Sequence, residues 1–117
     1  MKIGFIGLGN MGAPMSAVLA SAGHEVRGFD PAAAAPEGIT QVFSAEDAAA
    51  EAECVVSMLP DGGTLRSVAD TLHPAMASGA LHLDCSTVDV DSARAVAEAA
   101  TAHGLSALDA PVSGGTA

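Results

Sequence analysis

Basic and aromatic residues are scarce in this sequence of 117 residues. Only 4 Lys and Arg stand against 14 Asp and Glu, and the resulting formal net charge of −10 argues against nucleic acid or an anionic membrane surface as a partner. There is no Trp or Tyr and only 3 Phe, although hydrophobic residues make up 50% of the chain. The core must therefore be built from small aliphatic side chains, which suit helices packed closely on a parallel sheet.

Long apolar segments and metal-binding motifs are also missing. No run approaches the roughly 20 apolar residues that span a bilayer, and Lys2 is followed by glycine-punctuated sequence rather than by the apolar core of a signal peptide. The two cysteines, Cys54 and Cys85, and the four histidines lack the short spacings of metal ligands. We therefore expect free thiols, no metal site, no membrane contact and a cytoplasmic location.

Strand-like and helix-like segments alternate along the chain. The expected strands are 2–6, 25–29, 41–43, 54–58, 81–84 and 105–108. The expected helices are 11–22, 45–52, about 64–72, and a last one that begins at Asp89 or Asp91 and ends at Ala102. This alternation predicts a single α/β domain with a doubly wound parallel sheet, whose ligands bind at the carboxyl ends of the strands.

A glycine motif, Gly7-x-Gly9-x-x-Gly12, joins the first expected strand to the first expected helix. Gly7 allows a sharp turn, Gly9 lets a pyrophosphate approach the backbone, and Gly12 lets the helix pack close to the strand. The N–H groups at the start of that helix then face the phosphates. The predicted dinucleotide-binding turn comprises Gly7, Leu8, Gly9, Asn10, Met11 and Gly12. The alternative is a turn that only packs a helix on a sheet.

An acidic residue, Asp30, ends the second expected strand, about 20 residues after the motif, where a Rossmann fold places the acid that binds the adenosine ribose. The alternative is an Asp that only forms a turn before Pro31. Residues 31–35 contain no Lys or Arg that could neutralise a 2′-phosphate. The sequence therefore predicts NAD as the cofactor, in preference to NADP.

The segment Phe5–Met15 resembles the N-terminal signature of the β-hydroxyacid dehydrogenases, a family that includes 3-hydroxyisobutyrate dehydrogenase and tartronate semialdehyde reductase. Three later segments resemble the same family: Met58-Leu59-Pro60, Asp84-x-Ser86-Thr87, and the stretch from Asp109 to Gly115 that reads Asp-Ala-Pro-Val-Ser-Gly-Gly. The chain departs from the family at Val18, where an Asn is usual.

The resemblance implies roles for individual residues. It implies cofactor contacts at Leu59, Pro60, Thr64 and Thr87, the last at the nicotinamide end. It implies substrate contacts at Ser86, Ser113, Gly114 and Gly115, the last three around a carboxylate. Taken without the family, Leu59 is nearly as well explained as a core residue, Ser86 and Thr87 are better explained as helix caps, and residues 113–115 as a glycine-rich loop.

The implied activity is an NAD-dependent hydride transfer between the nicotinamide and the hydroxyl-bearing carbon of a small β-hydroxy acid. The family's catalytic Lys lies in a helical second domain, and the only Lys here is Lys2. We therefore expect residues 1–117 to form the cofactor domain, ending at the start of the interdomain helix, inactive alone and prone to form homo-oligomers. The alternatives are an NADPH-dependent semialdehyde or imine reductase and a stand-alone nucleotide-sensing domain.

Overall fold

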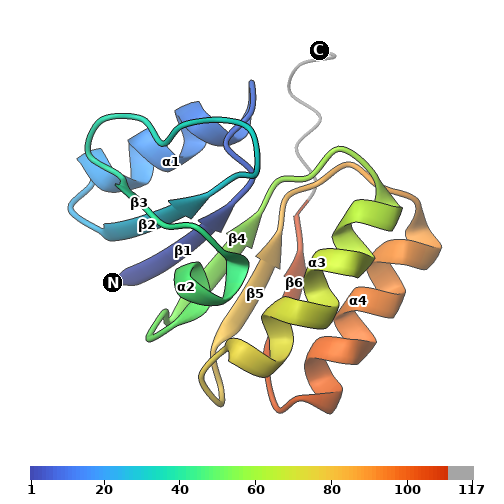
Figure 1. The fold of residues 1–117 in the computed structure, drawn as a ribbon. Helices are drawn as coiled ribbons and strands as arrows, with labels where there is room; N and C mark the ends of the chain where they lie inside the picture. Colours follow the sequence, from blue (N-terminus) through green and yellow to red (C-terminus); the bar gives the residue numbers. More distant parts are fainter. Residues whose placement is uncertain (111–117) are drawn as a thin grey trace.

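The computed structural model describes residues 1–110, and it has one parallel sheet whose six strands lie in the order β3-β2-β1-β4-β5-β6 (Figure 1). The strands are β1 Lys2–Ile6, β2 Glu25–Phe29, β3 Thr40–Gln41, β4 Cys54–Ser57, β5 Leu81–Asp84 and β6 Ser106–Asp109. The helices are α1 Gly12–Ser21, α2 Ala45–Ala49, α3 Gly62–Ala75 and α4 Val90–Ala102. The predicted doubly wound α/β fold is confirmed, and the strand order reverses between β1 and β4.

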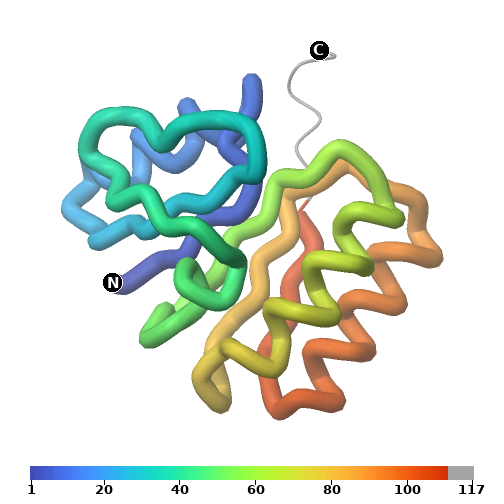
Figure 2. Tube along the Cα trace, viewed as in Figure 1, coloured from blue at the N-terminus to red at the C-terminus, as the bar shows by residue number. Residues whose placement is uncertain are grey.

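Helices cover both faces of the sheet. On one face, α1 packs over Ile3, Phe5 and Val26. On the other, α2, α3 and α4 bury a second apolar cluster that includes Val55 and Leu72. The path of the chain in Figure 2 shows α3 and α4 lying side by side on this second face. Because β1 lies under helices on both sides, its residues from Ile3 onward are all buried.

Element boundaries differ from the prediction mainly in α2, which ends at Ala49 and not at Ala52, and in α3 and β3. Helix α3 begins before Thr64, because Asp61 caps it by accepting a hydrogen bond from the Thr64 N–H (2.8 Å). It continues past Leu72 to Ala75. Strand β3 is only two residues long and ends at Gln41. The prediction extended it to Phe43, which lies beyond the strand and is 79% exposed. An edge strand this short leaves little backbone for another chain to pair with.

The face of the sheet that carries α1 is only partly covered. Leu108 on β6 is 55% exposed, and its neighbours Leu81 and Leu83 on β5 are half-buried on the same face. Self-association through such a face stays a prediction.

Cys54 and Cys85 are free and buried. Within residues 1–110, no helix is long and apolar enough to cross a membrane.

Candidate functional site

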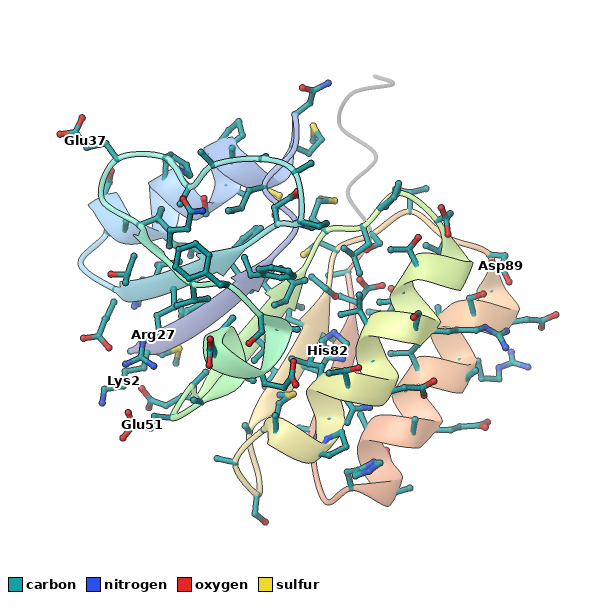
Figure 3. The ribbon with its side chains drawn as sticks, viewed as in Figure 1. Lys2, Arg27, Glu37, Glu51, His82 and Asp89 are labelled. Atoms are coloured by element: carbon teal, nitrogen blue, oxygen red, sulfur yellow. The ribbon has the colours of Figure 1, made fainter. Side chains whose placement is uncertain are left out.

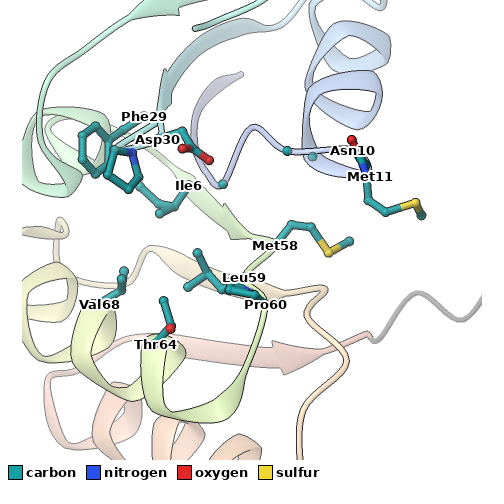
Figure 4. Close-up of a pocket in the computed structure, with 14 residues that line it drawn as sticks. Ile6, Asn10, Met11, Phe29, Asp30, Met58, Leu59, Pro60, Thr64 and Val68 are labelled. Atoms are coloured by element: carbon teal, nitrogen blue, oxygen red, sulfur yellow. The ribbon is translucent and has the colours of Figure 1, made fainter. Parts of the chain in front are cut away.

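A cavity of about 520 Å³ opens where the strand order reverses, at the carboxyl ends of β1, β2 and β4. Figure 4 shows Phe29 and Asp30 on one side of it and Leu59, Thr64 and Val68 on the other. The lining residues are Ile6, Gly7, Gly9, Asn10, Met11, Gly12, Phe29, Asp30, Pro31, Met58, Leu59, Pro60, Thr64 and Val68. The structure thus brings together the predicted cofactor residues, with the exceptions of Leu8 and Thr87.

The apolar wall of this cavity contains residues that the sequence reasoning missed. They are Ile6, Phe29, Pro31, Met58 and Val68. A signal was available, because Phe29 and Met58 directly precede predicted site residues at strand ends, and Val68 follows Thr64 by one helical turn. The wall offers an apolar surface on which a flat ring can pack.

The three glycines of the turn have different surroundings. Gly7 has a φ of +101°, and a Cβ on it would overlap the carbonyl oxygen of Met58. A Cβ on Gly12 would overlap the Gly7 carbonyl oxygen and lie 3.3 Å from Phe5 Cε1. A Cβ on Gly9, in contrast, would meet no atom within 4 Å. Gly7 and Gly12 are therefore required by the fold itself, whereas Gly9 leaves open space on the cavity side.

The amino end of α1 differs from those of the other helices. Ser44, Asp61 and Asp89 each cap a helix by accepting a hydrogen bond from a backbone N–H in its first turn. Met11, at the corresponding position of α1, makes no side-chain cap, and the first turn of α1 contains no acid. The Ala13 N–H donates to the Gly9 carbonyl oxygen (3.0 Å) and Pro14 has no N–H. The Gly12 N–H and the positive end of the helix dipole are therefore what α1 offers at the cavity, an arrangement that suits a phosphate.

Asp30 carries the negative charge of the cavity. Its Oδ2 accepts a hydrogen bond from the Leu8 N–H (2.8 Å), and its Oδ1 accepts from the N–H groups of Ala32 (2.8 Å) and Ala33 (2.9 Å). Burial opposes ionisation of this carboxyl, but the three N–H donors outweigh it and lower the pKa below its usual range. Asp30 thus forms the turn and also lines the cavity as a carboxylate.

No cation balances that carboxylate in the cavity. The four Lys and Arg residues are Lys2, Arg27, Arg66 and Arg94, and none of them lines it. Figure 3 shows Lys2 and Arg27 close to Glu51, and an Arg27 nitrogen lies 3.9 Å from the Glu51 carboxylate. Arg66 donates a hydrogen bond to Ser92 Oγ (3.1 Å). Within residues 1–110, no group of His, Cys, Asp and Glu side chains is arranged to bind a metal ion.

Comparison with known proteins identifies the family. Residues 2–117 match the family model described as the NAD binding domain of 6-phosphogluconate dehydrogenase. This chain belongs to that family. Its NAD-binding domain is 50% identical to a probable 3-hydroxyisobutyrate dehydrogenase of Mycobacterium tuberculosis, over 97% of this chain and 40% of the relative.

Two further relatives extend this comparison. An NAD-dependent L-serine dehydrogenase of Pseudomonas aeruginosa is 44% identical over 99% of this chain and 42% of its own length. The solved structure of the M. tuberculosis 3-hydroxyisobutyrate dehydrogenase with L-serine superimposes with a TM-score of 0.91 at 49% identity, covering 96% of this chain and 40% of that one. The resemblance to the β-hydroxyacid dehydrogenases is confirmed. The chain spans about 40% of the length of these relatives.

The residues assigned to the substrate and the nicotinamide lie outside the cavity or outside the described residues. Ser86 is 1% exposed, and neither Ser86 nor Thr87 lines the cavity. Ser113, Gly114 and Gly115 fall beyond residue 110. The roles of these five residues stay predictions.

A buried polar network in the NAD-binding domain was not foreseen from the sequence. His73 Nε2 and His82 Nδ1 lie 2.9 Å apart, and His82 Nε2 lies 2.9 Å from Ser57 Oγ. Ser57 Oγ donates in turn to Asp84 Oδ1 (2.8 Å). Burial, with a smaller effect of His73, lowers the pKa of His82 to about 4 in spite of the nearby Asp84. The labelled His82 lies on β5 beneath the helices in Figure 3.

Proposed function

We propose that this chain is the cofactor-binding part of an NAD-dependent oxidoreductase acting on a small β-hydroxy acid similar to 3-hydroxyisobutyrate. The observation that carries the proposal is the cavity, which joins the glycine turn, the uncapped end of α1 and the Asp30 carboxylate. Relatives named 3-hydroxyisobutyrate dehydrogenase and L-serine dehydrogenase support this substrate class, because 3-hydroxyisobutyrate and L-serine are both β-hydroxy acids.

The residues of the cavity fit a dinucleotide. The open space beside Gly9 admits a pyrophosphate, whose charge the Gly12 N–H and the positive end of the α1 dipole stabilise. Among residues 1–110, Asp30 Oδ2 accepts only the Leu8 N–H, so it retains a lone pair that can accept a hydrogen bond from a ribose hydroxyl. Leu59, Pro60 and Val68 supply apolar surface for the adenine. When bound, the nicotinamide supplies the hydride chemistry, and the chain binds and orients it.

The preference for NAD over NADP is part of the proposal. A 2′-phosphate on the adenosine ribose would lie beside the Asp30 carboxylate, and no Lys or Arg lines the cavity to neutralise it. The negative charges of the 2′-phosphate and the Asp30 carboxylate repel each other, so NADP binds more weakly than NAD.

Ser113, Gly114 and Gly115 remain the proposed site for the substrate carboxylate, and Thr87 the proposed contact at the nicotinamide end. Both roles rest on the matching family motifs in the sequence.

Calorimetric titration of the chain with NADH and with NADPH tests the proposal. We expect saturable binding of NADH and much weaker binding of NADPH. A chain that folds but binds neither cofactor would remove the proposed function, and tighter binding of NADPH would reverse the cofactor assignment.

A further inference from the structure

The loop after β4, residues 58–60, forms one wall of the cavity at the point where sheet hydrogen bonding stops. Met58 N–H still donates to the Ile6 carbonyl oxygen (2.9 Å), as an extension of the ladder between β1 and β4. The next N–H, that of Leu59, points to the β5 side and donates to the side chain of Ser86, at Oγ (2.7 Å), instead of to a backbone carbonyl. The path of the loop beyond the ladder therefore depends on a side chain from the segment after β5.

Ser86 is fixed by two further hydrogen bonds. Its hydroxyl donates to Asp84 Oδ1 (2.7 Å), and the Ser86 N–H donates to the same oxygen (3.2 Å). A hydroxyl has one proton, so donation to the carboxylate leaves a lone pair of Oγ directed at the Leu59 N–H. Ser86 and Asp84 are 1% and 5% exposed, which leaves little room for water to replace either contact.

We propose that Ser86, oriented by Asp84, is a positioning residue that fixes the loop 58–60 against the bound dinucleotide. This inference rests on the proposed function and deepens it, since it gives Ser86 a role in cofactor binding. Ser86 acts through Leu59, because Leu59 lines the cavity and Ser86 does not.

The loop also contacts the glycine turn, so its position affects both walls of the cavity. A Cβ on Gly7 would overlap the Met58 carbonyl oxygen, which shows how closely the two backbones approach. A shift of Met58 and Leu59 therefore changes the space available to the pyrophosphate as well as the apolar wall formed by Leu59 and Pro60.

Ser86→Ala tests the proposal, with Ser57→Ala as its matched control. Both variants remove one buried serine hydroxyl that donates to Asp84 Oδ1, but only Ser86 also reaches Leu59. We expect Ser86→Ala to raise the Kd for NADH about tenfold, the effect of losing one buried hydrogen bond. Ser57→Ala should lower the melting temperature and change that Kd less than about twofold. Ser86→Thr, which retains a hydroxyl, should restore most of the affinity.

Amide hydrogen exchange provides a readout that does not depend on the cofactor. In Ser86→Ala, exchange at Leu59 should accelerate, while exchange at Met58, which bonds to Ile6, should stay slow. Unchanged NADH affinity and unchanged Leu59 protection in Ser86→Ala would overturn the proposal. Equal weakening by Ser57→Ala and Ser86→Ala would overturn it too, because the network would then act only through global stability. A folded parent chain that binds no NADH would instead refute the proposed function.

Discussion

Leu8 and Asp30, which lie 22 residues apart, are joined by a hydrogen bond of 2.8 Å from the Leu8 N–H to Asp30 Oδ2. This bond ties the glycine turn after β1 to the end of β2. Asp30 therefore has two functions in one side chain: it fixes the turn, and it presents a carboxylate to the cavity. A substitution there must be judged on cofactor preference and on stability separately.

Asp30→Asn should reduce the discrimination between the two cofactors. One repulsive contact between a carboxylate and a 2′-phosphate is worth about 1–3 kcal/mol, which corresponds to roughly a 5- to 150-fold preference for NADH in the parent chain. Without the charge, the ratio of the two Kd values should fall by most of that factor. Titration of both cofactors against both chains measures it, and thermal denaturation reports the separate loss of the turn. An unchanged ratio would show that Asp30 does not face the 2′ position.

Gly9→Val should abolish cofactor binding while the fold survives. A branched side chain at Gly9 would enter the space we assign to the pyrophosphate, and no protein atom lies within 4 Å of the new Cβ. We expect the Kd for NADH to rise more than about 100-fold, the equivalent of about 3 kcal/mol. The melting temperature should change little.

Gly9→Ala and Gly12→Val are the matched controls for that experiment. The single methyl of Gly9→Ala should have an intermediate effect on binding. Gly12→Val should unfold the domain, since even a Cβ there would overlap the Gly7 carbonyl oxygen. Binding of NADH by Gly9→Val at the parent's affinity would mean that the glycine motif serves only the fold.

The sequence was a good guide where a residue's role depends on its neighbours along the chain. The glycine motif follows a strand directly and Asp30 ends one, so position in the chain places both at the cavity. Ser86 shows the limit. Its motif indicated a polar residue near the site, but its partner, the Leu59 N–H, is 27 residues away and becomes a neighbour only when β4 and β5 pair.

The histidines show the same limit more strongly. From the sequence His73 and His82 are scattered, with no motif spacing. In the fold α3 packs against the sheet and brings His73 Nε2 within 2.9 Å of His82 Nδ1. No local pattern encodes a contact of this kind, because it depends on how a helix lies across a strand.

Acid should destabilise the fold through His82. Burial lowers the pKa of His82 in the folded chain to about 4, from an ordinary value near 6.5, so between these pH values the unfolded chain binds the extra proton. The free energy of unfolding therefore falls as the pH falls from about 6.5 to 4, by about 3 kcal/mol from this group. His73, whose pKa burial and His103 also lower, acts in the same direction.

Denaturant unfolding at pH 7 and at pH 4.5 measures this effect. His82→Gln should be less stable than the parent at pH 7, because it disturbs the bonds to Ser57 and His73. It should nevertheless lose less stability on acidification, since the titrating group is gone. An equal pH dependence in the two chains would assign the acid sensitivity to other groups.

The chain alone should not oxidise a β-hydroxy acid, although we expect it to bind NADH. Turnover requires an acid–base group within hydrogen-bond reach of the substrate hydroxyl. Lys2 begins β1, at the opposite end of that strand from the glycine turn, and His73 and His82 are buried away from the cavity. A steady-state assay with NAD and 3-hydroxyisobutyrate or L-serine should therefore read background in a preparation whose NADH binding has been measured. Turnover that Lys2→Ala abolishes would identify Lys2 as the acid–base group, and turnover that persists in that variant would assign this role to another residue of the chain.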